Sequence, residues 1–80
     1  MDKLKDLDIV ALTENISATH FETGDNITLY KGQVGTIVMD YDGIFFEVEF
    51  ANNDGTTYAM ETISANQLMQ LHYDLLEAVA

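Results

Sequence analysis

The sequence predicts a small all-β domain, and three observations lead to this prediction. The chain has 80 residues, which is enough for one domain with one small core. Within 45–50, aromatic and aliphatic residues alternate with mostly acidic ones, the period of two that is typical of a half-buried strand. Turn-forming residues lie on both sides of this strand, at 41–43 (YDG) and 51–55 (ANNDG). Phe46, Val48 and Phe50 are therefore expected to face the core.

The first 30 residues are expected to contain one clear strand. The segment 1–7 is polar, and 8–12 (DIVAL) comes next as a strand rich in β-formers. Residues 13–25 are expected to form a long, partly ordered loop, because their Ser, Thr and Asn side chains compete for backbone hydrogen bonds. A short extended piece at 26–30 then leads into Lys31 and Gly32.

The central hairpin spans 31–50. Gly32 and Gly35 lie three residues apart, which is typical of a tight turn or bulge at the start of a strand. The second strand is predicted at 35–40 and the third at 44–50. After the turn at 51–55, a fourth strand is predicted at 56–63.

The C-terminal part begins with a capping box, with Ser64 as N-cap and Gln67 three residues later. Two interpretations fit residues 65–80. In the first, Leu68, Leu71, Leu75 and Val79 lie on one face of a single helix over 65–79. In the second, a helical turn at 65–68 precedes a short strand at 69–72 and a tail at 73–80.

The net charge is −11, from 14 acidic residues against three lysines. This field repels nucleic acids, whose binding requires phosphate neutralisation by basic residues, and attracts basic protein surfaces or cations. Solubility alone is a sufficient reason for such a charge. The chain has no cysteine, which favours a cytoplasmic protein, and its first ten residues lack the apolar stretch of a signal peptide.

Some of the acidic residues are candidates for catalytic or metal-binding groups. Glu47 and Glu49 share one face of a strand, about 6.5–7 Å apart, and Asp40, Asp42 and Gly43 match a fragment of a calcium loop. We prefer the simpler explanation, that Glu47 and Glu49 lie on a solvated strand face and that Asp40, Asp42 and Gly43 belong to a turn. His20 and His72 are far apart in the sequence, so no catalytic or zinc role is expected for them. We predict no enzyme activity, no metal site and no cofactor; the alternative is a divalent-metal-dependent enzyme or cation-binding domain that uses the surface carboxylates.

A succession of short motifs resembles a known family. The motifs are 8–12 (DIVAL), 31–38 (KGQVGTIV), 46–50 (FEVEF), 54–55 (DG), Ile63 and Leu68. Together they are similar to the small bacterial proteins of domain-of-unknown-function family 4926. The resemblance implies a five-stranded SH3-like barrel over 8–72, with one helical turn at 65–68 and a closing strand at 69–72. Residues 73–80 run past the matched region as an extension that can form a short helix.

The 31–38 block also resembles the KOW-type segment of ribosomal and transcription-elongation proteins. Those proteins combine the glycines with many basic residues, whereas this chain has only Lys3, Lys5 and Lys31. We therefore expect no RNA binding.

The predicted function is that of an acidic module that binds a partner protein, with an immunity-like, antitoxin-like or accessory role. Aromatic residues beside acids on the outside of the barrel suit protein recognition. The candidate partner-binding residues are Tyr30, Tyr41, Phe45, Glu47, Glu49 and Tyr58. Leu75, Leu76 and Val79 of the tail are expected to dock on the domain itself or on a second copy, so the protein is a monomer or a homodimer.

Overall fold

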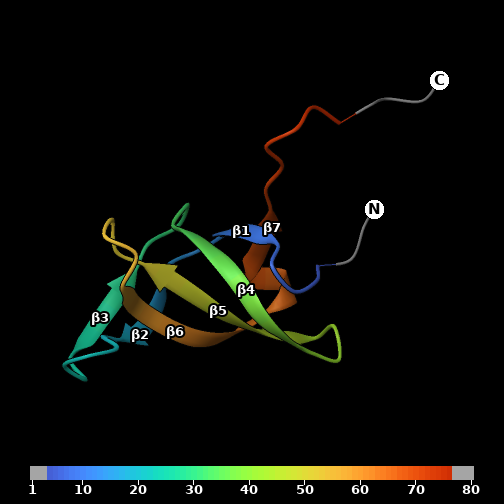
Figure 1. The fold of residues 1–80 in the computed structure, drawn as a ribbon. Coiled ribbons are helices and arrows are strands. Elements are labelled where there is room, and N and C mark those ends of the chain that lie inside the picture. Colours follow the sequence, from blue (N-terminus) through green and yellow to red (C-terminus); the bar gives the residue numbers. More distant parts are fainter. Residues whose placement is uncertain (1–3, 77–80) are drawn as a thin grey trace.

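The computed structural model describes residues 4–76 and has an all-β fold, which confirms the all-β part of the prediction (Figure 1). A 3₁₀ turn, η1 (Ala65–Gln67), precedes the last strand. The strands of the described residues are β1 (Ile9–Leu12), β2 (Ile16–Thr19), β3 (Asn26–Leu29), β4 (Val34–Tyr41), β5 (Phe45–Ala51), β6 (Thr57–Ser64) and β7 (Leu68–Gln70).

Five strands form one antiparallel sheet in the order β6-β5-β4-β1-β7, and β2 pairs with β3 in a second sheet. These five strands correspond to the five that the sequence predicts. β1 lies between β4 and β7, with Val10 opposite Gly35 on one side and opposite Gln70 on the other. The two sheets do not close into a barrel within the described residues.

The core lies under the inner face of the five-stranded sheet. Phe46, Val48 and Phe50 of β5 are buried, as their alternation predicts. The β2–β3 hairpin adds Ala18 and Leu29 to the same cluster. The other buried members are Val10, Leu12, Ile37, Ala59, Ile63 and Leu68.

The prediction of a long loop over 13–25 is wrong. Residues 16–19 form β2, which pairs with β3 from Ile16 opposite Leu29 to Thr19 opposite Asn26. Only 20–25 connect the two strands. Four residues with one buried side chain, Ala18, carry too little alternation to indicate a strand. The Ser and Thr side chains instead point outward from a half-buried strand.

The interpretation of 65–79 as one helix is also wrong. Leu68 is buried because it pairs with Leu12 of β1, so its environment is set by a distant strand rather than by helical neighbours. Gln67 Oε1 accepts the Ser64 N–H (3.2 Å), as the capping box predicts. Residues 73–76 are not helical, and Val79 lies outside the described residues. In residues 4–76, no helix has the length and apolar character needed to cross a membrane.

Leu75 and Leu76 do not dock on the domain, in contrast to one of the two expectations for the tail. Their side chains are 98% and 71% exposed. Figure 1 shows the chain leaving the sheet after β7 and extending away from it. Leu76 lines a hollow with Leu7 and Ile9 but is not buried there.

Gly35 is required where β4 passes close to β5. A Cβ at this position would lie 2.8 Å from Val48 Cγ1, 2.9 Å from the Glu49 carbonyl oxygen and 2.9 Å from Phe50 Cε1. One of these contacts is with backbone and two are with buried side chains. The site therefore has no space for a methyl group.

We expect Gly35→Ala to lower the free energy of unfolding by about 1–3 kcal/mol, the usual effect of overpacking a core. Urea denaturation measures this change. Thr28→Ala, at an exposed position of β3, is the control and should change stability by no more than about 0.5 kcal/mol. Equal stabilities of the two variants would contradict the packing argument.

Candidate functional site

Exposed apolar side chains gather on the β4–β5 hairpin. We use the name hairpin surface for these apolar residues together with the acidic residues of the same hairpin. Its apolar members are Val38, Met39, Tyr41, Ile44 and Phe45, and its acidic members are Asp40, Asp42, Glu47 and Glu49.

The hairpin surface is shaped by a tight turn and a bulge. Asp42 (φ 60°) and Gly43 (φ 74°) form the turn, and Asp40 Oδ1 accepts the Gly43 N–H at 2.6 Å. The strand pairing shifts between Ile37 and Met39, which adds one residue to β4. Because of this bulge, Val38 and Met39 are both exposed rather than alternating between core and solvent.

Cross-strand pairing places the predicted aromatic and acidic residues together. Tyr41 lies opposite Phe45, and Met39 lies opposite Glu47. Phe45, Glu47 and Glu49 occupy the face of β5 that points away from the core, since Phe46 and Val48 between them are buried. The structure therefore brings together four of the six predicted partner-binding residues: Tyr41, Phe45, Glu47 and Glu49.

Each glutamate of β5 has its own hydrogen-bond partner on β6. The Thr62 hydroxyl donates to Glu47 Oε1 at 2.6 Å, and the Thr57 hydroxyl donates to Glu49 Oε2. These bonds fix the two carboxylates side by side on an open face instead of directing them at a common point. The arrangement suits contact with a partner better than acid–base chemistry, which requires two carboxyl groups in different environments.

Tyr30 and Tyr58 lie elsewhere. Tyr30 is exposed in the turn before β4, at the opposite end of that strand from Tyr41. The β5–β6 pairing skips Tyr58, because it shifts from Phe50–Ala59 to Ala51–Thr57. The Tyr58 ring is half-buried and packs edge-on against His20, with ring centroids 5.1 Å apart. Tyr58 thus anchors the β2–β3 hairpin.

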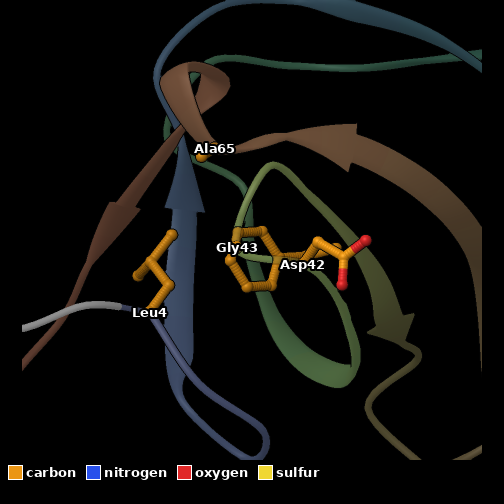
Figure 2. A pocket seen from close by; sticks show the side chains of 5 residues that line it. Leu4, Asp42, Gly43 and Ala65 are labelled. Carbon is orange, nitrogen blue, oxygen red and sulfur yellow. The ribbon is translucent and has the colours of Figure 1, made fainter.

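A hollow of about 290 Å³ lies at the end of the hairpin. Figure 2 shows Leu4 and Ala65 on two sides of it, with the Asp42 carboxylate on the side away from Leu4. Among the described residues that line the hollow, which also include Gly43 and Phe46, Asp42 is the only charged one. The hollow offers an apolar recess beside one negative charge, without the converging polar groups of a catalytic site.

Few of the carboxylates are neutralised by cations. In the described residues, Lys5 Nζ and Asp8 Oδ1 form an ion pair at 3.0 Å, and no other ion pair is found. No group of three or more Asp, Glu or His side chains in residues 4–76 is placed to hold a metal ion. The four carboxylates of the hairpin surface therefore have no ion-pair partner within the described residues.

Val38, Met39 and Ile44 were not among the sequence-predicted site residues. The run Ile37–Met39 is apolar, and a regular strand would have directed Ile37 and Met39 to the same face. A bulge depends on the pairing with the neighbouring strand, which the run alone does not reveal. Exposure of Ile44 results from its position after the turn.

The fold and this surface define a small all-β domain with an exposed apolar and acidic face. The chain belongs to the family named DUF4926, a domain of unknown function, whose model matches residues 6–70. The resemblance to family 4926 is thereby confirmed. No curated protein and no solved structure matches the chain.

The turn between β5 and β6 contains one carboxyl group with a displaced pKa. The Thr56 hydroxyl donates to Asp54 Oδ1 at 2.6 Å, and the Thr56 N–H donates to the same oxygen at 3.0 Å. The hydroxyl bond is the larger cause, the N–H bond the next, and together they hold the pKa of Asp54 below its usual range. Because the folded-state pKa is depressed, this contribution to stability is present at neutral pH and lost as the pH falls through that pKa.

We expect Thr56→Val to raise the pKa of Asp54 toward its usual range, since the hydroxyl donor is removed and the backbone donor is kept. An NMR titration of the Asp54 carboxyl carbon measures the pKa. Thr56→Ser keeps a hydroxyl and should keep the pKa low. The same Asp54 pKa in the wild type and in Thr56→Val would show that the hydroxyl bond has no effect.

Proposed function

We propose that this domain is an acidic protein-interaction module whose hairpin surface binds a basic region of a partner protein. The observation that supports the proposal most directly is the exposed apolar cluster on the β4–β5 hairpin, bordered by four carboxylates. Interfaces of this kind combine buried aromatic anchors with a polar rim. Tyr41 and Phe45 are the anchors, and Glu47 and Glu49 belong to the rim.

The charge of the chain supports a basic partner. The whole chain carries a net charge of −11, and in the described residues only Asp8 is paired with a lysine. A basic partner would be attracted over a distance of about one Debye length, roughly 10 Å at 0.1 M salt. Such attraction accelerates association and rejects acidic partners. Nucleic acids are disfavoured by the same field.

We also propose that the domain is a variant of the SH3-like barrel. Two features support this: the five-stranded antiparallel sheet in the order β6-β5-β4-β1-β7, and the 3₁₀ turn directly before its last strand. The β2–β3 hairpin lies against the free side of β6, where the Phe21 N–H donates to the Tyr58 carbonyl oxygen at 2.9 Å. We propose that the module acts in the bacterial cytoplasm, as an immunity-like or antitoxin-like protein or as an accessory subunit.

The metal-dependent alternative has less support. It needs Asp40, Asp42, Glu47 and Glu49 to converge on one cation. Asp40 instead accepts the Gly43 N–H inside the turn, and each glutamate is bonded to a different threonine. These partners give the carboxylates structural roles that do not depend on a metal ion.

The test compares proteins retained from a lysate of the source cell by three immobilised forms. We expect the wild type to retain a basic protein that elevated salt releases. Tyr41→Ala/Phe45→Ala should bind this protein at least about ten-fold more weakly, because the loss of aromatic anchors typically costs about 2 kcal/mol or more. Titration of the purified partner by calorimetry measures the difference.

Tyr30→Ala is the matched control, since Tyr30 is an exposed aromatic residue outside the hairpin surface. It should retain the partner as the wild type does. Retention that is equal for the wild type and Tyr41→Ala/Phe45→Ala would contradict the proposed surface. A retained protein that is acidic, or that salt does not release, would contradict the charge argument.

A further inference from the structure

Within residues 4–76, no strand pairs with the outer edge of β7. β7 is the last strand of its sheet, and in residues 4–76 it pairs only with β1. The Leu71 N–H donates to the Ile9 carbonyl oxygen, and the Thr13 N–H donates to the Gln67 carbonyl oxygen. Odd-numbered residues of this segment therefore direct their backbone groups toward β1. The backbone N–H and C=O groups of the even-numbered residues, such as Gln70, point outward. An added strand could form hydrogen bonds with them.

An apolar tail continues directly from this edge. Residues 71–76 have no regular secondary structure and leave the domain (Figure 1). Tyr73, Leu75 and Leu76 are 90%, 98% and 71% exposed. A hollow of about 330 Å³ lies where the tail begins. It is lined by Ile9, Val34, Leu71, His72 and Tyr73. The same chain thus presents an exposed apolar segment and, where that segment begins, an apolar hollow.

The tail and the edge are complementary in sequence. If the tail continues the extended backbone of β7, two copies can pair antiparallel about a twofold axis at His72. Three kinds of apolar pair then form between the copies, each of them twice: Leu68 with Leu76, Met69 with Leu75 and Leu71 with Tyr73. Gln70 lies opposite Asp74, so the polar residues also match. An axis at Leu71 would place Leu68 opposite Asp74, which puts a carboxylate against the edge of the core.

We propose that the occupant of the β7 edge is a second copy of this chain. Each tail adds a strand to the β7 edge of the other copy, and the two five-stranded sheets become continuous. Such an isologous contact uses the same surface on both copies, as a twofold dimer requires. It involves none of the hairpin surface and does not depend on the proposed function.

The β7 edge carries few acidic residues. Two copies with a net charge of −11 each repel one another. Residues 62–73, however, contain no Asp or Glu, and the nearby Asp8 is paired with Lys5 at 3.0 Å. β7 and its flanking residues therefore add little to this repulsion, and Asp74 is the acidic residue of the paired segment 68–76. Because salt screens the remaining long-range repulsion, we expect the dimer to strengthen as the ionic strength rises.

Sedimentation equilibrium of the full chain tests the proposal. The average mass should rise with concentration from that of a monomer to that of a dimer. Met69→Lys places an ammonium group opposite Leu75 of the second copy and should weaken the dimer at least about ten-fold. Phe21→Lys is the control, because Phe21 is similarly exposed (60%, against 55% for Met69) and lies in the β2–β3 connection.

A mixture of two variants tests the register. Leu75→Glu alone should also weaken the dimer. Mixed with Met69→Lys, it should form a heterodimer, because the new lysine of one copy then faces the new glutamate of the other. A chain that stays monomeric up to about 1 mM would overturn the proposal. So would a Met69→Lys dimer as strong as that of Phe21→Lys, or a mixture that forms no heterodimer.

A single thiol tests the position of the twofold axis. The chain has no cysteine, so His72→Cys introduces one thiol per copy. Opposite residues of a hydrogen-bonded antiparallel pair have Cα atoms about 5.5 Å apart, which is within the range for a disulfide. With glutathione disulfide as oxidant, His72→Cys should form a covalent dimer much faster than Phe21→Cys. Equal rates for the two variants would overturn the proposed register.

Discussion

The structure depends on the pairing of β1 with two strands from distant parts of the chain. β1 contributes Val10, Ala11 and Leu12, all buried, and bonds to β4 on one side and β7 on the other. β7 has only three residues, too few to be stable without this partner. β1 comes from the start of the chain, but its two neighbours in the sheet, β4 and β7, come much later. The sheet is therefore complete only after these long-range pairings have formed.

β1 also separates the acidic hairpin surface on β4 and β5 from the edge of β7, which has no acidic residue. β4, β5 and β6 are joined by tight turns, and the hairpin surface lies on β4 and β5, where most of the acidic residues of the sheet are found. β7 lies beyond β1 at the other end of the sheet, in the longest acid-free part of the C-terminal half. A basic partner at the hairpin and a second copy at β7 would therefore not compete for the same residues.

The sequence was most informative where neighbouring residues decide the structure. Alternation in β5 correctly predicted that Phe46, Val48 and Phe50 are buried and that Glu47 and Glu49 share the outer face. Asp42–Gly43 correctly predicted the hairpin turn, because both residues tolerate a positive φ. β2 was missed since its four residues bury a single side chain, and Val38 and Met39 were missed since their exposure results from a bulge.

By itself the sequence determined the all-β class, the central hairpin and its turn, and the net charge of −11. These depend on short-range alternation, on backbone preferences at Asp42 and Gly43, and on composition. Tertiary structure decided whether Leu68–Gln70 is helix or strand, and it placed Tyr58 against His20 instead of beside Glu47 and Glu49. The reason is that β1 and the β2–β3 hairpin, both far away in the chain, supply the partners that fix those residues.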